Sequence, residues 1–119
     1  MEKNESRFGD IYRQAIAFRN KRDWAQFHDP KNLAEAIVIE AAELLETFLW
    51  KDVKGSRKVC LKKRQALKEE MADILIYLMY MSKSCSIDLL AAAKEKLNIN
   101  ARKYPLALSR GSSKKYSEL

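Results

Sequence analysis

The sequence predicts an all-α protein built as a bundle of four main helices. Only three glycines and two prolines interrupt the 119 residues, which leaves little of the turn chemistry that a sandwich or barrel of short strands requires. Apolar residues recur at helical spacing in several long segments. A hydrophobic content of 47% is enough for a compact core rather than a disordered chain.

The first predicted helix runs from about residue 6 to residue 24. Its apolar residues recur every three or four positions and therefore share one face. They are Phe8, Ile11, Ala15 and Phe18. A short polar connection around Pro30 follows, because proline lacks a backbone donor and disfavours helix in the residue before it.

The second predicted helix covers residues 33–50, with Asn32 as its N-cap and Glu35 placed to reach back to the cap. Residues 51–62 are basic, lack helical periodicity and contain Gly55, so we expect a surface loop there. The two ends of this loop must lie close together if the flanking helices pack antiparallel.

The third predicted helix runs from about residue 61 or 63 to residue 84. Its second half is apolar nearly all round, so it should be the central, buried helix. Ser86 or Asp88 then caps a fourth helix over residues 89–102.

Tyr104 and Pro105 close the fourth helix, and the chain continues as a tail rich in Ser, Lys and Gly. We expect residues 1–105 to form a single domain and residues 106–119 to be a flexible basic tail.

The net charge of +7 suits a polyanionic partner but does not choose between nucleic acid, an anionic membrane and a phosphorylated small molecule. Cys60 and Cys85 lack the spacing of a zinc site or a disulfide framework. The longest apolar stretch, residues 74–81, is shorter than the roughly 20 residues that cross a bilayer, and the start of the chain is polar. We therefore expect a cytoplasmic protein without a membrane partner.

Two pairs of acidic residues lie on apolar faces of the second and third predicted helices. In a helical projection Glu40 falls inside the apolar stripe and Glu43 on its margin, while Glu70 and Asp73 project among bulky apolar residues. Either pair alone is compatible with a solvated or salt-bridged helix face. Two such pairs in this order, with a basic segment between them, favour a functional site.

Each pair has the spacing i, i+3, so two facing helices can present four convergent carboxylates. Buried unpaired carboxylates cost several kcal/mol or become protonated, so a cation must compensate them. Oxygen-only ligands select magnesium, manganese or calcium over zinc, and magnesium usually takes further ligands from water and substrate phosphates. The pattern therefore predicts a metal site for a phosphate ester.

Four segments of this sequence resemble the MazG-like branch of the all-alpha nucleoside triphosphate pyrophosphohydrolase superfamily, which is related to dCTP pyrophosphatases. They are R-D-W-A-Q-F-H from Arg22, I-E-A-A-E-L-L-E-T-F-L-W-K from Ile39, E-E-M-A-D-I-L-I-Y-L from Glu69 and K-L-N-I-N-A-R-K-Y-P from Lys96. The resemblance covers roughly residues 8–105.

The resemblance implies that Glu40, Glu43, Glu70 and Asp73 bind Mg²⁺, with Mn²⁺ as a possible substitute. The implied reaction is house-cleaning hydrolysis of the α,β-phosphoanhydride of a deoxynucleotide, dCTP-like in preference, which yields a nucleoside monophosphate and diphosphate. Glu40 or Glu43 would orient or deprotonate the attacking water.

The resemblance also implies substrate-binding residues. Trp24 and Trp50 would enclose the base unless they pack in the core, and His28 would contact base or phosphate unless it is structural. Lys51 follows Trp50 in the same matching segment. The phosphate side would be Lys96, Asn100 and Arg102, whose alternative reading is a solvated helix face.

One departure concerns Ala15, where the dCTP-specific relatives carry a polar base-contacting residue. It leaves the selectivity for deoxycytidine open.

The family resemblance implies a homodimer or a homotetramer, and a single copy does not cover every apolar face of the second and third predicted helices. The alternative function is a non-enzymatic helical protein that binds nucleic acid or a protein partner through its basic loop and tail. Nothing in the sequence resembles a helix-turn-helix or an aromatic-and-basic nucleic-acid motif, so nucleic acid is not the expected partner.

Overall fold

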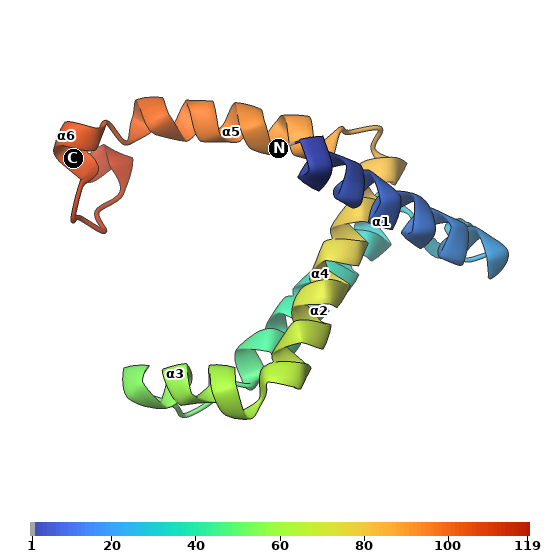
Figure 1. Ribbon diagram of the computed structural model, residues 1–119, viewed down its shortest axis with the longest axis horizontal. Helices are drawn as coiled ribbons and strands as arrows, with labels where there is room; N and C mark the ends of the chain where they lie inside the picture. Colours follow the sequence, from blue (N-terminus) through green and yellow to red (C-terminus); the bar gives the residue numbers. More distant parts are fainter. Residues whose placement is uncertain (1) are drawn as a thin grey trace. The chain divides into compact units, whose positions relative to one another are not determined.

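The computed structural model describes residues 2–119, with side chains described from Arg7 onward. All regular secondary structure in this range is helical, which confirms the all-α prediction (Figure 1). The chain divides into two compact units, the first ending at Ser86 and the second beginning at Ile87.

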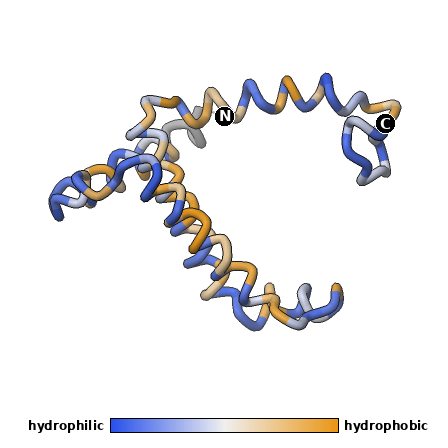
Figure 2. Tube along the Cα trace, turned by 180° about the vertical axis from the view of Figure 1, so that it is seen from behind, coloured by the Kyte–Doolittle hydropathy of each residue, from blue (hydrophilic) through white to orange (hydrophobic). Residues whose placement is uncertain are grey.

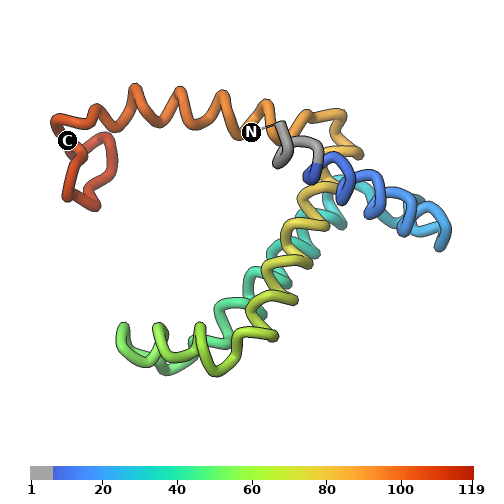
Figure 3. Tube along the Cα trace, viewed as in Figure 1, coloured from blue at the N-terminus to red at the C-terminus, as the bar shows by residue number. Residues whose placement is uncertain are grey.

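The first unit contains five helical elements. They are α1 (Glu2–Lys21), the 3₁₀ helix η1 (Ala25–Phe27), α2 (Pro30–Glu46), α3 (Val53–Lys62) and α4 (Arg64–Ser84). The central helix is α4, which packs most extensively on α2 and also contacts α1 and α3 (Figure 3). The prediction of a central third helix over residues 63–84 is confirmed.

The core of the first unit lies where α1, α2 and α4 meet. Leu33 and Met79 are fully buried, and Ala15 and Tyr80 complete the cluster. Phe8, Tyr12 and Ile16 of α1 pack against this cluster, as do Ile76, Tyr77 and Met81 of α4. Burying a side chain of the size of Leu33 or Met79 contributes about 1.5–3 kcal/mol, so these contacts hold α2 and α4 in register.

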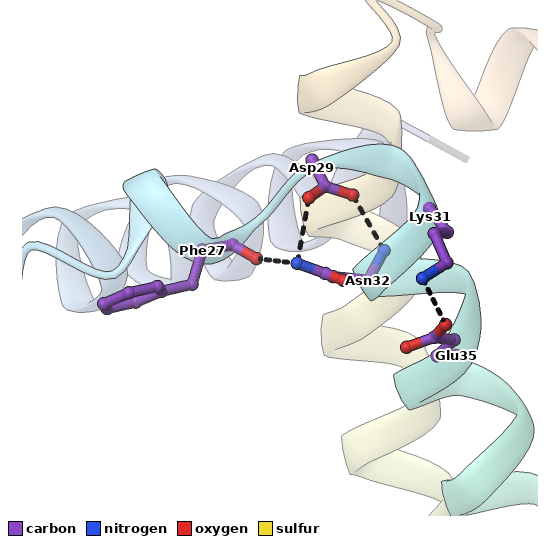
Figure 4. A network of polar contacts seen from close by, with 5 residues as sticks. All are labelled: Phe27, Asp29, Lys31, Asn32 and Glu35. Atoms are coloured by element: carbon purple, nitrogen blue, oxygen red, sulfur yellow. Dashed lines mark hydrogen bonds and ion pairs between the residues drawn. The ribbon is translucent and has the colours of Figure 1, made fainter.

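The start of α2 differs from the prediction, because Asp29 and not Asn32 is the N-cap (Figure 4). The Asp29 carboxylate accepts from the Asn32 backbone N–H at 2.9 Å. Pro30 occupies the first helical position, where its missing N–H costs nothing. Asn32 instead donates its side-chain amide to the Phe27 carbonyl at 3.2 Å, and Glu35 pairs with Lys31 at 3.0 Å rather than reaching back to a cap.

The sequence predicts that this helix continues to residue 50, which is too far along the chain. The helix stops at Glu46, and Thr47–Trp50 form turns. Thr47 follows the helix as its C-cap, and its hydroxyl donates to the Leu44 carbonyl at 2.6 Å. Trp50 adopts a φ of 62°, a left-handed conformation that is strained for a bulky residue.

The surface loop predicted over residues 51–62 is wrong, since most of this segment is helix α3. Asp52 caps α3 by accepting from the Gly55 N–H at 2.7 Å, so the glycine lies in the first turn and does not break the helix. Val59 is buried, and it anchors the helix to the rest of the unit. A cap and one tertiary contact outweigh the weak helical pattern of this segment.

The second unit contains α5 (Leu89–Lys103), the short helix α6 (Leu106–Ser109) and the 3₁₀ helix η2 (Tyr116–Glu118). Of the two predicted caps, Ser86 and Asp88, it is Asp88 that caps α5, and its carboxylate accepts from the Ala91 N–H at 3.1 Å. The Tyr104 and Tyr116 rings meet edge to face at 6.1 Å. Residues 106–119 therefore contain two short helical segments, and their flexibility stays a prediction.

Cys60 and Cys85 are exposed free thiols. No single helix within residues 2–119 is long and apolar enough to cross a membrane, although α4 and α5 counted together reach the length and composition of a broken span.

The capping geometry predicts that Asp29→Ala lowers the free energy of unfolding by about 1 kcal/mol, because two donors at the start of α2 lose their acceptor. Urea denaturation followed by circular dichroism measures this change. The matched control is Glu35→Ala, which removes an exposed ion pair on the same helix and should cost no more than about 0.5 kcal/mol. Equal effects of the two substitutions would contradict the assignment of Asp29 as the cap.

Candidate functional site

Three carboxylates converge where α2 faces α4. Glu40, Glu43 and Glu70 each offer an oxygen, and these oxygens all lie within 4.8 Å of one another. The first two are separated by one helical turn on α2, and the third comes from the facing side of α4. The structure thus brings together three of the four acidic residues that the sequence singled out.

The electrostatics of this cluster are those of an uncompensated anionic site. Burial, a hydrogen bond shared with Glu70 and the negative charges of Glu43 and Asp73 together raise the pKa of Glu40 to about 7. One carboxylate oxygen of Glu70, Oε2, is buried without a hydrogen-bond partner. Neither the Arg13–Asp10 ion pair nor the Lys31–Glu35 ion pair involves any of these groups.

This donor set fits a hard divalent cation. It consists only of carboxylate oxygens, it is concentrated enough to retain a proton near neutral pH, and it includes an orphaned buried oxygen that a cation would satisfy. Oxygen-only sites of this kind suit magnesium, manganese or calcium.

Asp73 lies beside this cluster without belonging to the group of three. It is exposed, and its negative charge raises the pKa of both Glu40 and Tyr77. It also lines a neighbouring cavity. Asp73 therefore stands between the carboxylate cluster and that cavity.

The cavity has a volume of about 400 Å³ and lies between α1 and α4. Its walls are mainly apolar and aromatic. They are formed by Ile11, Gln14, Ala15, Phe18, Trp24, His28, Asp73, Ile76, Tyr77 and Tyr80. Phe18 and Trp24 meet edge to face at 5.7 Å, and the His28 ring lies 4.7 Å from the Tyr80 ring. Such walls suit a flat ring with a few polar substituents.

Among the polar groups of this cavity, the surroundings of His28 define both its position and its protonation state. Its backbone carbonyl accepts from the Ser84 hydroxyl at 2.9 Å, which ties the η1–α2 connection to the end of α4. Burial and, to a smaller extent, the positive charge of Arg19 lower the pKa of His28. Its Nδ1 atom is buried without a partner. The ring is therefore uncharged near neutral pH and has one free hydrogen-bonding atom.

Tyr77 connects the two compartments. It lines the cavity, and its pKa is raised by burial and then by the negative charges of Glu40, Asp73 and Glu43. The apolar cavity and the anionic cluster are therefore adjacent. A ligand with a flat ring and a charged chain can occupy both at once.

A second hollow of about 430 Å³ also adjoins the cluster, and it is lined by Glu43, Glu46, Thr47, Lys63 and Glu70. Lys63, at the junction of α3 and α4, is the only basic residue on this wall.

The predicted substrate residues fall into two groups. Trp24 and His28 line the cavity. Trp50 and Lys51 do not, and Trp50 is 92% exposed. The three remaining residues, Lys96, Asn100 and Arg102, lie on α5 in the second unit. Lys96 and Arg102 are exposed, and Asn100 is half-buried.

Sequence reasoning missed the roles of Tyr77, Tyr80 and Arg19. Tyr77 follows Asp73 by four residues and therefore lies on the same helix face, a signal that could have placed it at the site. Tyr80 belongs to an apolar run and gave no separate signal. Arg19 near the end of a helix is typical of a solvated position, yet it is only 6% exposed.

Comparisons with known proteins agree on one family. The MazG-like family model matches residues 36–119. The chain is 46% identical to human (Homo sapiens) dCTP pyrophosphatase 1 over 112 residues, or 92% of this chain. It is 44% identical to the bovine (Bos taurus) dCTP pyrophosphatase 1 over 118 residues, or 98% of this chain. The chain spans 66% of the human and 70% of the bovine relative, about two thirds of their length.

A solved structure is similar as well. It is a pyrophosphatase from Archaeoglobus fulgidus, 40% identical, with a TM-score of 0.76. The similarity covers 86% of this chain and 93% of that chain.

The raised pKa of Glu40 predicts a pH dependence of stability. Without metal, the folded protein holds a proton on Glu40 that the unfolded chain releases between about pH 4.5 and 7, so stability falls as the pH rises through this interval. A divalent cation competes with that proton and should raise the melting temperature more at about pH 8 than at about pH 6. At a hundredfold excess over its Kd the stabilisation is about 2.7 kcal/mol, which corresponds to several degrees.

Thermal unfolding with magnesium or with a chelator measures this shift. Glu43→Gln should reduce this shift strongly. Glu118→Gln, which removes an acidic residue of the tail, should leave the shift unchanged. An equal metal-induced shift in wild type and Glu43→Gln would contradict the site.

Proposed function

The chain belongs to the MazG-like family, and from this premise we propose that it is a magnesium-dependent nucleoside triphosphate pyrophosphohydrolase. The reaction is the hydrolysis of a deoxynucleoside triphosphate to the monophosphate and diphosphate, as a cytoplasmic house-cleaning activity with a dCTP-like preference. The observation that carries this proposal is the junction of an anionic cluster with an apolar, aromatic cavity within one unit of the fold. The names of the human and bovine relatives support the substrate class.

The proposed metal ligands are Glu40, Glu43, Glu70 and Asp73. Mg²⁺, or Mn²⁺ in its place, would neutralise triphosphate charge and make water more acidic. Before it binds, Glu40 retains a proton up to about pH 7, so cation and proton compete for the same oxygens. One carboxylate of the Glu40–Glu43 pair orients the attacking water and accepts its proton.

The cavity is the proposed base site. Trp24 offers an aromatic face for stacking, and the uncharged imidazole of His28 forms a polar part of the same wall. Ala15 contributes only a methyl group to the wall, so base selection falls to the other lining residues. Tyr77 leads from this cavity toward the carboxylates, which is the direction the triphosphate must take.

The proposed phosphate side comprises Lys51 and three residues of α5. Cations there would offset the triphosphate charge, and an amide would donate to a phosphate oxygen. The α5 residues are Lys96, Asn100 and Arg102. We further propose that residues 1–105 form the catalytic domain and that the basic residues 106–119 are an accessory tail.

We propose that the active protein is a homodimer or a tetramer built from dimers, with the four-helix bundle completed by a second chain. On α2, Val38 and Leu45 share one face and are 66% and 71% exposed. On α4, Met71 is 61% exposed and Leu75 41%. Hydrophobic residues recur along both helices (Figure 2), and contiguous exposed apolar faces of this kind are typical of protein–protein interfaces.

Trp50 fits the same assembly. Its ring is 92% exposed and its backbone is held in a left-handed conformation. A strained residue presenting a large aromatic side chain to solvent is typical of a functional position. We propose that Trp50 covers the base bound by a neighbouring protomer.

A nucleotide panel tests the activity. We expect the purified protein to convert at least one of dCTP, dUTP, dATP, dTTP, their ribose forms or modified-base analogues to monophosphate and pyrophosphate with magnesium, and none with chelator. Glu43→Gln and Asp73→Asn should each lower kcat/KM by about 10- to 100-fold or more. Relief of carboxylate repulsion should leave these variants at least as stable as the metal-free wild type.

The matched control for these variants is Glu35→Gln, an exposed acid on the same helix that pairs only with Lys31; it should keep full activity. Absence of turnover across the panel would favour the alternative of a non-enzymatic binder that uses the basic α3 segment and tail. Retained activity in both site variants would defeat the metal-site assignment.

The exposed face of α2 predicts the oligomeric state. Size-exclusion chromatography with light scattering should show a dimer or tetramer for wild type and a monomer for Leu45→Glu, because a buried charge at an apolar interface costs several kcal/mol. Leu106→Glu replaces an equally exposed leucine outside α2 and α4, at 75% exposure, and should not change the mass. A monomeric wild type would contradict the proposal.

A further inference from the structure

Among the residues whose side chains the structure describes, none is an acidic partner for the buried charge of Arg19. It lies near the end of α1 and is 6% exposed. Among the described residues its only side-chain hydrogen bond is the long contact from Nε to the Asn20 side-chain oxygen, 3.4 Å. Arginine cannot lose its proton, and an unpaired buried charge is costly. Its position therefore calls for a compensating interaction.

Tyr80 supplies that interaction. The guanidinium carbon of Arg19 lies 5.6 Å from the centre of the Tyr80 ring, within the range of a cation–π contact. The same ring contacts His28 at 4.7 Å with a tilt of 35°, and Tyr77 meets it edge to face at 6.2 Å. Tyr80 is thus the shared neighbour of Arg19 and His28.

Arg19 contacts the walls of the cavity but does not line it. Tyr80 and His28 line it, while Arg19 does not. The end of α1 is fixed, because the Arg19 carbonyl accepts from both Arg22 N–H at 3.2 Å and Trp24 N–H at 3.1 Å. Arg19 can therefore influence a ligand only through the two rings that it supports.

We propose that Arg19 is a positioning residue for base selection, which through the Tyr80 ring holds His28 in place as a hydrogen-bonding wall of the cavity. The ligand class is a nucleobase, read along one edge. This inference rests on the proposed function, since the cavity is assigned there to the base.

The charged groups around His28 differ in their effect on its pKa. Arg19 comes from α1, Arg22 from the turn after α1, Asp73 from α4, and Asp29 follows His28 directly in the chain. The Asp29 carboxylate is engaged by two donors of Asn32. Burial and the charge of Arg19 lower the pKa of His28, and no acid offsets them.

The uncharged state of His28 decides what the cavity can accept. A neutral imidazole has one donor and one acceptor, whereas an imidazolium has two donors. Cytosine presents an amino group where uracil presents a carbonyl oxygen, so the two bases respond differently to the protonation of His28. A charged His28 favours the carbonyl-bearing base.

The first test measures His28 directly. It is the only histidine of the chain, so after removal of any affinity tag its imidazole resonance is unambiguous in an NMR titration without substrate. Arg19→Met should move the midpoint upward, and Arg19→Lys should move it less. Arg13→Met, which removes the same charge from an exposed position of α1, should leave it unchanged. An unchanged midpoint in Arg19→Met would overturn the proposal.

The second test measures selectivity as the ratio of kcat/KM for dCTP to that for dUTP between about pH 5.5 and 8. Both substrates use the same carboxylates, so the titration of Glu40 cancels in the ratio. In wild type we expect the fall of this ratio to occur at lower pH than in Arg19→Met, because Arg19 lowers the pKa of His28. In Arg19→Met the ratio should fall about five- to tenfold toward low pH. A change of this size corresponds to the loss of roughly one hydrogen bond in the transition state. A ratio that stays constant in the variant would overturn the proposal.

Two controls keep the tests decisive. Replacing an unpaired buried charge with methionine should leave the melting temperature unchanged or raise it. If Arg19→Met does not fold, Tyr80→Phe should keep the wild-type midpoint of His28 and Tyr80→Leu should change it; equal midpoints in these two variants would overturn the proposal.

Failure of the proposed function would be visible separately. It would appear as no hydrolysis of any triphosphate, while the substrate-free titration would still decide whether Arg19 controls His28. Binding of dCMP and dUMP, followed at the His28 resonance, then tests the base contact without turnover. The absence of any response of His28 to either monophosphate would overturn the assignment of His28 as the base-reading wall.

Discussion

Repulsion among the carboxylates between α2 and α4 is the constraint on which the rest of this structure depends. The two helices form the most extensive interface of the first unit, and that interface brings three anionic oxygens within 4.8 Å. The cluster is tolerated because Glu40 retains a proton to about pH 7. The buried side chains of Leu33 and Met79, about two turns away, also pack between the two helices and hold them together. The core therefore holds together an interface that its own charges oppose.

The parts of the site that depend only on local helix geometry could be predicted from the sequence. The spacing of Glu40 and Glu43 and the position of Glu70 on an apolar face were sufficient to expect their convergence. The parts that depend on tertiary contacts could not. Helix α3 exists because Asp52 caps it and Val59 is buried, and the capping of α2 by Asp29 depends on Pro30 occupying the first helical position. Neither fact is visible in periodicity alone.

The cavity shows a second limit of sequence patterns. Ile11, Ala15 and Phe18 were expected on a core-facing stripe of the first helix, and they do share a face, but that face lines a cavity. Apolar periodicity reports that a face avoids water and does not distinguish between a side chain and a ligand as the group that covers it. Ile11 and Phe18 are each nearly half exposed, which is consistent with a surface that a ligand completes.

The groups that break the ordinary rules of a protein interior are concentrated in one place. Glu70 has an unpaired buried oxygen, His28 an unpaired buried nitrogen, and Arg19 a buried charge with no acidic partner among the described side chains. All three adjoin the carboxylate cluster or the cavity beside it. Each lowers stability on its own, so a fold under selection for stability alone would lose them. Their clustering supports the proposal that a cation and a base ring complete this part of the structure, since both would satisfy groups that lower stability on their own.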